Sequence, residues 1–181
     1  MKHLFFIILF FVALNSLSQN KYITKTGHVS FEASASSLEE VKAINSSVTA
    51  IFNTENGDFA ALILVKGFRF KNALMEEHFN ENYAESDKYP KATFKGKIQN
   101  FSLDNLSTIN TFKINGVLMF HGKTKQLNNV ILKVNRHDNV ITTSGKFNVK
   151  VSDFDIKIPK IVGDKISESV EIIINFSLEK K

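Results

Sequence analysis

The sequence contains no cysteine, and this absence excludes several kinds of protein chemistry. The chain forms no disulfide, offers no thiolate to zinc, and has no cysteine that could carry a lipid anchor. A domain without disulfides is stabilised by its hydrophobic core alone. The 181 residues, of which 43% are hydrophobic, are enough to build one such domain.

Long hydrophobic runs are absent except at the N-terminus, where residues 4–14 read LFFIILFFVAL. This run is shorter than the roughly 20 residues of a transmembrane helix. It follows the basic pair Lys2-His3 and precedes Ser16-Leu17-Ser18, which has small residues at the positions read by signal peptidase. We predict that residues 1–18 are a signal peptide cleaved before Gln19, and that residues 19–181 form one soluble periplasmic or secreted domain.

Catalytic and metal-binding motifs are also lacking. No G-x-S-x-G or H-E-x-x-H motif occurs, and His28, His78, His121 and His137 lie in different segments without ligand spacing. The formal net charge of +5 comes from lysines spread along the chain, as on a solvated exterior. Because the basic residues do not cluster with aromatic ones, we expect no nucleic acid partner. We predict no catalytic residues, no metal site and no enzyme activity.

Alternation of apolar and polar residues is the dominant pattern in the rest of the chain. In residues 170–178, for example, Val170, Ile172 and Ile174 alternate with other residues, as in a strand with one buried face. Eight strands are predicted in this way, at 28–35, 47–54, 58–66, 92–101, 111–120, 128–136, 140–151 and 169–179, with a short extra strand at 21–25. Eight sequential antiparallel strands can close into a barrel that is filled by side chains or holds one slender ligand.

Helix and turn signals lie between these strands. A capping-box pattern, Ser37 to Glu40, predicts a helix over 37–45, and Asn72 is the expected N-cap of a second helix over 72–82. Pro90 forces the preceding residue out of the helical region and so separates the acidic second helix from the next strand. Asn56-Gly57 predicts a hairpin with a type I′ turn.

Phenylalanine occurs 17 times while tryptophan is absent, and many phenylalanines fall at inward positions of the strands. Three glycines share this face, and they either open a channel between aromatic walls or mark bends in coiled strands. We predict that the inward residues line an apolar binding site: Phe31, Phe52, Phe94, Gly96, Ile98, Phe112, Ile114, Gly116, Leu118, Phe120, Gly145, Phe147, Val149, Ile172, Ile174 and Phe176. The second helix is predicted to cover one end of the barrel as a lid, with Met75, His78 and Phe79 facing the site.

Three short segments carry motifs that resemble those of a known protein family. The first is HFNENYAESDKYPKATF, in which the matching residues are Tyr89, Pro90, Ala92 and Phe94. The second is a hairpin with the matching residues Gly116, Leu118, Gly122, Thr124 and Lys125. The third, before the last strand, contains Phe147, Asp153, Phe154 and Ile156. In their order and spacing, the three segments resemble the YceI family of exported, lipocalin-like polyisoprenoid-binding proteins.

The resemblance implies an all-β fold, an eight-stranded antiparallel lipocalin-like barrel with one or two short helices. It also implies an exported binding protein that holds a long-chain isoprenoid or other lipid, a quinone-type lipid included, for carriage or storage, with no further cofactor. Two alternatives are open: a filled structural or stress-related interaction barrel without ligand, and an enzyme that uses the same pocket. A homodimer and a weak contact with an anionic membrane surface are both compatible with the sequence.

Overall fold

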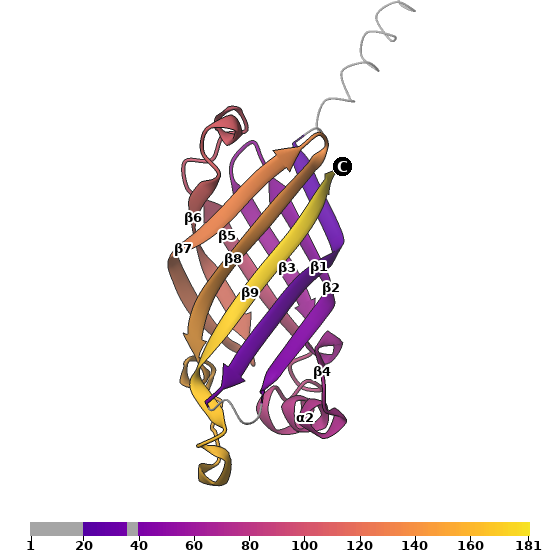
Figure 1. Ribbon diagram of the computed structural model, residues 1–181, viewed down its shortest axis with the longest axis vertical. Helices are drawn as coiled ribbons and strands as arrows, with labels where there is room; N and C mark the ends of the chain where they lie inside the picture. The colour runs from indigo at the N-terminus through magenta and orange to yellow at the C-terminus, as the bar shows by residue number, and fades with distance from the viewer. Residues whose placement is uncertain (1–19, 36–39) are drawn as a thin grey trace, which may run out of the picture.

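The computed structural model describes residues 20–35 and 40–181, and the predicted signal peptide lies outside them. The chain forms a tall barrel of long, tilted strands (Figure 1). The strands are β1 (Lys21–Ser34), β2 (Lys42–Asn53), β3 (Asp58–Leu64), β4 (Arg69–Phe70), β5 (Lys91–Ile98), β6 (Thr111–Phe120), β7 (Lys123–His137), β8 (Val140–Lys150) and β9 (Ile166–Lys180). Helical segments are η2 (Val65–Gly67), α2 (Ala73–His78), η3 (Phe79–Tyr83), η4 (Asp104–Ser107), η5 (Val151–Phe154) and η6 (Lys160–Val162).

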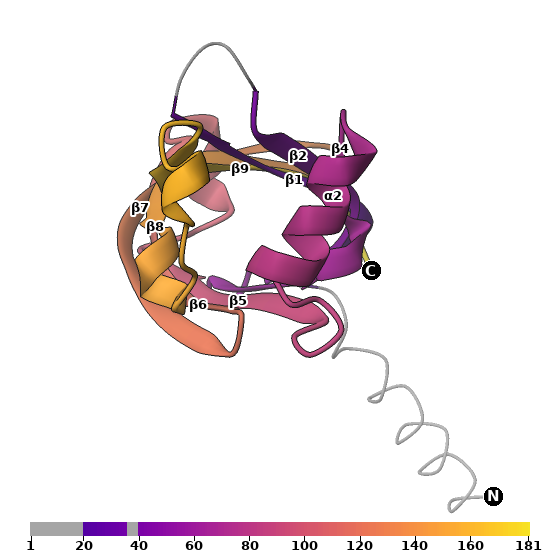
Figure 2. The ribbon, with the colours of Figure 1, turned by 90° about the horizontal axis from the view of Figure 1, so that it is seen from below.

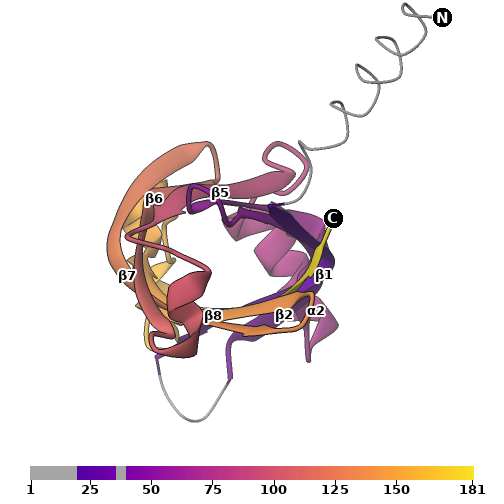
Figure 3. The same cartoon turned by 90° about the horizontal axis from the view of Figure 1, so that it is seen from above.

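The barrel is a closed antiparallel sheet of eight strands. Its order is β1-β9-β8-β7-β6-β5-β3-β2, with the two-residue β4 beside β2, and a β1–β2 pairing closes the ring. Neighbouring strands in the ring are also neighbours in sequence, apart from β9, which returns to β1 (Figure 3). The predicted eight-stranded antiparallel barrel is therefore confirmed. The predicted short strand at 21–25 and the strand at 28–35 are one continuous strand, β1.

The predicted helix over 37–45 is wrong where the structure describes it. Residues 42–45 belong to β2, and residues 36–39 lie outside the described residues. Ala43 pairs with Phe31 of β1 and is fully buried, whereas Ile44, which pairs with Ser30, is 45% exposed. The capping-box pattern predicts a helix from local bonds only, whereas residues 42–45 pair with β1, and Ala43 and Ile44 pair also with β4.

The turns differ from their predictions in one case. Only Gly57 has positive φ in the 53–58 connection, and its N–H donates to the carbonyl of Asn53, so this is a longer turn and not type I′. His121 and Gly122 both have positive φ, at 49° and 72°, in the two-residue connection of β6 and β7. The type I′ backbone therefore occurs in the β6–β7 hairpin and not at the Asn56-Gly57 pair.

The upper half of the barrel is a solid core. Phe52 and Ile98 are almost completely buried there, and the ring of Phe101 lies 4.7 Å from that of Phe52 and 5.3 Å from that of Phe112. The segment between β5 and β6, which contains η4, folds over part of this end and packs Leu103 and Leu106 against the core (Figure 3). The upper end is thus closed by side chains. No helix in the described part of the chain has the length and apolar character to cross a membrane.

Candidate ligand-binding cavity

The lower half of the barrel contains a cavity of about 390 Å³. This volume lies within the range of about 300–1,000 Å³ that is typical of small-molecule sites. Strand residues form its wall: Val29, Phe31, Ala33, Phe59, Ala61, Ile63, Phe70, Ala92, Phe94, Ile114, Leu118, Phe120, Leu127, Val130, Leu132, Phe147, Val149, Ile166, Val170, Ile172, Ile174 and Phe176. Every one of these side chains is apolar, so the wall offers no hydrogen bond to a ligand.

The mouth of the cavity lies at the lower end of the barrel between two helical segments. Seen from below, α2 lies on one side of this end and the segment with η5 and η6 on the other (Figure 2). The first segment contributes Asn72, His78 and Tyr83 to the cavity lining, and the second contributes Lys165. Polar groups of the lining therefore come from the mouth segments alone. This distribution suits a ligand with a long apolar tail and one polar end.

The lid helix begins as its sequence predicts. The side chain of Asn72 accepts a hydrogen bond of 2.9 Å from the backbone N–H of Leu74, which makes it the N-cap, and the helix continues through α2 into the π-helical turn η3. Phe79 inserts between three aromatic rings of the barrel, with centroid distances of 5.3 Å to Phe31, 5.8 Å to Phe68 and 5.3 Å to Phe70. The lid is therefore fixed to the barrel by an aromatic cluster.

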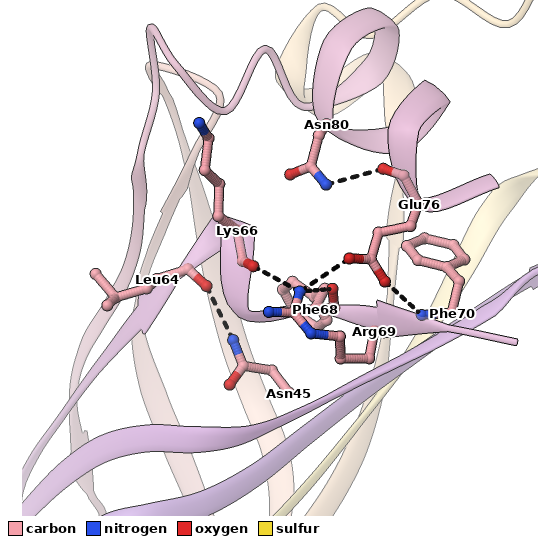
Figure 4. A network of polar contacts seen from close by, with 8 residues as sticks. All are labelled: Asn45, Leu64, Lys66, Phe68, Arg69, Phe70, Glu76 and Asn80. Atoms are coloured by element: carbon pink, nitrogen blue, oxygen red, sulfur yellow. Dashed lines mark hydrogen bonds and ion pairs between the residues drawn. The ribbon is translucent and has the colours of Figure 1, made fainter. Parts of the chain in front are cut away.

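A polar network attaches the other side of the lid helix (Figure 4). The carboxylate of Glu76 accepts from Arg69 Nη1 at 2.9 Å and from the backbone N–H of Phe70 at 3.2 Å. The side chain of Asn45 on β2 is fully buried and donates to the carbonyl of Leu64, at the end of β3, at 2.9 Å. Since β4 also pairs with β2, the two bonds to Glu76 connect the lid to the barrel wall.

A second anchor joins the segments on both sides of the mouth. His121 Nε2 lies 2.6 Å from Glu85 Oε2, and Nδ1 lies 2.8 Å from the carbonyl oxygen of Phe154. The ring of Tyr89 packs edge-on against His121 at 4.6 Å. The turn of the β6–β7 hairpin thus contacts both the segment that follows the lid and the segment that begins at η5.

Two ion pairs hold the η5 segment beside the same hairpin. Lys125 Nζ donates to Asp153 at 2.8 Å, and Lys123 Nζ lies 2.6 Å from Asp155. The hydrogen bond from Lys125, with a second one from the backbone N–H of Lys150, holds the pKa of Asp153 below its ordinary value. The Lys123 ammonium likewise lowers the pKa of Asp155. Both carboxylates are therefore ionised at neutral pH.

The structure brings together most, but not all, of the predicted site residues. The cavity lining includes Phe31, Phe94, Ile114, Leu118, Phe120, Phe147, Val149, Ile172, Ile174 and Phe176, and also the lid residues Met75, His78 and Phe79. It does not include Phe52, Ile98, Phe112, Gly96, Gly116 or Gly145. The first three of these belong to the solid upper core.

The glycines do not leave open space at their own positions. Gly96 and Gly116 lie opposite each other on β5 and β6, and a Cβ on Gly116 would lie 2.5 Å from Phe94 Cζ and 2.6 Å from the Lys95 carbonyl oxygen. The ring of Phe94 therefore lies against these two glycines. The β6–β7 register also shifts between Ile114 and Gly116. At this point the glycines mark a close approach and a bend of the strands.

Several lining residues carry no sequence prediction. Phe68 and Phe70 follow β3, and Ile158 and Val162 belong to the segment between β8 and β9. The alternating pattern is interrupted in both places, so period-two reasoning does not detect them. In the described part of the chain, no group of three or more histidine and carboxylate side chains is placed to hold a metal ion.

These features define a class of protein: a single β-barrel with one packed end and one apolar cavity under a helical lid. Comparison with known families then identifies the group. The YceI-like domain family matches residues 21–178, and the chain belongs to this family. The three segments that resemble this family in sequence contribute Tyr89, Lys125, Asp153 and Phe154 to the contacts around the β6–β7 hairpin.

Solved structures support the fold. A polyisoprenoid-binding domain from Saccharophagus degradans, implicated in plant cell wall breakdown, has a TM-score of 0.74 at 13% identity, with 90% of this chain and 99% of that chain covered. Burkholderia cenocepacia BcnA has a TM-score of 0.70 at 18% identity, with coverage of 84% and 95%. A Campylobacter jejuni YCEI protein has a TM-score of 0.65 at 19% identity, with coverage of 81% and 88%. No curated protein matches the chain in sequence.

Proposed function

We propose that this protein binds a long-chain isoprenoid or another lipid, whose tail occupies the barrel cavity and whose polar end lies at the mouth. The observation that carries the proposal is the separation of the lining into an entirely apolar wall and a mouth with Asn72, His78, Tyr83 and Lys165. The Saccharophagus degradans relative is described as a polyisoprenoid-binding domain, which supports the same ligand class.

Burial of apolar surface is sufficient to bind a long tail in such a site, without specific hydrogen bonds. Each buried methylene contributes about 0.8 kcal/mol, so ten of them contribute roughly 8 kcal/mol before the cost of ordering the chain. A wall made only of aliphatic and aromatic side chains allows the tail to slide and bend without losing hydrogen bonds. We therefore expect the protein to discriminate ligands by tail length and shape more than by chemical detail.

Two other functions account less well for the cavity. A filled interaction barrel would have side chains in place of the 390 Å³ space in its lower half. An enzyme in the same pocket would require convergent titratable groups. Of the residues that line the described cavity, His78, Tyr83 and Lys165 are titratable, and all three belong to the mouth segments.

We also propose that the protein works outside the cytoplasm after removal of residues 1–18. The short apolar run, the basic residues before it and the small residues after it support export. A carrier in that compartment would hold a water-insoluble tail away from water between membranes or near one.

Native mass spectrometry of protein purified from its own host tests the binding function. We expect the wild type to carry a lipid-sized additional mass. Leu118→Trp places a large ring in the cavity and should abolish this mass, whereas Val117→Trp, at the neighbouring outward position that is 40% exposed, should retain it. If lipid-stripped wild type neither carries nor takes up farnesol or a longer prenol, the proposal is wrong.

A further inference from the structure

The segment between η5 and β9 extends beyond the lower end of the barrel and has an apolar tip (Figure 1). The tip is η6, and the side chain of Ile161 at its centre is 88% exposed. A single exposed aliphatic side chain is common on protein surfaces and does not by itself identify a partner.

The tip is continuous with the mouth of the cavity. Ile158 and Val162, on either side of Ile161 in sequence, line the cavity. Leu74, at the start of the lid on the other side of the mouth, is 56% exposed. Apolar surface therefore extends from the tip into the barrel, along the route that a lipid tail would take.

The charges around the tip are mostly positive, with three lysines and two aspartates in residues 155–165. Lys157 and Lys160 are exposed, and neither forms an ion pair with a residue that the structure describes. Two acidic residues flank the tip in sequence: Asp155 is paired with Lys123, and the exposed Asp164 is adjacent to Lys165. The lid carries the opposite charge, since Glu77 and Glu81 are exposed on it. An anionic surface would thus attract the tip and repel the lid.

We propose that residues 157–161 dock this protein on an anionic lipid bilayer. Ile161 enters the head-group region, and Lys157 and Lys160 contact lipid phosphates beside it. An inserted aliphatic side chain and neighbouring lysines act together in such contacts, because one supplies hydrophobic burial and the others electrostatic attraction. In this orientation the apolar route through Ile158 and Val162 begins at the membrane surface.

The docking does not require a ligand in the cavity, so it can be tested separately from the proposed function. Lipid-stripped protein is sedimented with vesicles of phosphatidylcholine, with and without 30 mol% phosphatidylglycerol. We expect binding to the anionic vesicles that weakens with added salt. The double variant Lys157→Glu, Lys160→Glu should bind at least tenfold more weakly. The control variant Lys97→Glu, Lys113→Glu makes the same change in net charge on exposed positions of β5 and β6 and should bind anionic vesicles much more strongly than the tip variant.

A fluorescent reporter tests the apolar part, because the chain has no native tryptophan. The fluorescence emission of the Ile161→Trp variant should shift to shorter wavelength when anionic vesicles are added. Tryptophan at Ile109→Trp, an exposed site of 49% in the segment over the opposite end, should not shift. Equal weakening by both lysine double variants, equal binding to neutral vesicles, or an unshifted reporter at position 161 would each overturn the proposal.

Discussion

Replacing Gly116 with alanine tests the close approach of β5 and β6 beside the cavity. The new Cβ would lie 2.5 Å from Phe94 Cζ, 2.6 Å from the carbonyl oxygen of Lys95 and 2.7 Å from Gly96 Cα. Two of these three neighbours are backbone atoms, which cannot rotate away. The strands must therefore separate, or the ring of Phe94 must move into the cavity.

The expected cost follows from these contacts. Overpacking of this kind costs about 1–3 kcal/mol. Because Gly116 does not have positive φ, alanine also gains about 0.4–1 kcal/mol by restricting the unfolded chain. The middle of each range leaves a net destabilisation of about 1.3 kcal/mol, which lowers the melting temperature of a domain of this size by about 3–5 °C. Lipid uptake should fall as well, because a displaced Phe94 would occupy cavity volume.

Thermal melting of the lipid-stripped proteins measures the effect. Gly163→Ala is the matched control, because a Cβ there would meet its nearest atom, the Lys160 carbonyl oxygen, at 3.5 Å. We expect this control to melt within about 1 °C of the wild type or slightly above it. A second variant combines Gly116→Ala with Phe94→Leu. It should recover only the part of the decrease in melting temperature that is due to the contact with the Phe94 ring. If Gly116→Ala melts like Gly163→Ala and takes up the same amount of lipid, the inferred close packing of β5 and β6 at Gly116 is wrong.

Three further predictions concern the lid, the ion pair of Asp153 that holds the η5 segment, and export. Phe79→Asp should release lipid while leaving far-UV circular dichroism nearly unchanged, because the ring joins a cluster with Phe31, Phe68 and Phe70 that holds the lid; full lipid retention would show that the lid does not close the cavity. The lowered pKa of Asp153 contributes stability above its ordinary pKa of about 3.9, and this contribution is lost as pH falls through the lowered folded value. The melting temperature of Asp153→Asn should consequently fall less steeply than that of the wild type below about pH 4, and parallel curves would contradict the assignment. N-terminal sequencing of the exported protein should begin near Gln19, whereas an uncleaved chain in the membrane pellet would refute export.

Local patterns in the sequence predict the barrel because each half-buried strand produces an alternation of apolar and polar residues. Each strand has one face on the core and one on water, so residues such as Phe112 and Ile114 alternate with exposed ones. The start of the lid helix is also predictable, because Asn72 caps it. Its end is at Tyr83, before Glu85 with its positive φ of 42°, and Pro90 lies beyond that point, immediately before β5. The helix expected over 37–45 fails for the opposite reason, since its capping pattern is local and the β1–β2 pairing that overrides it is not.

Tertiary structure alone decides which inward side chains fill the barrel and which surround empty space. Phe52 and Phe31 both lie at inward strand positions, but Phe52 packs against Phe101 in the closed upper end, whereas Phe31 lines the cavity beneath the lid. Period-two alternation gives the direction of a side chain and not its height along the barrel axis. That height, and the presence of a loop above or a helix below, depends on strand tilt and register, which arise only when distant strands pair and the sheet closes.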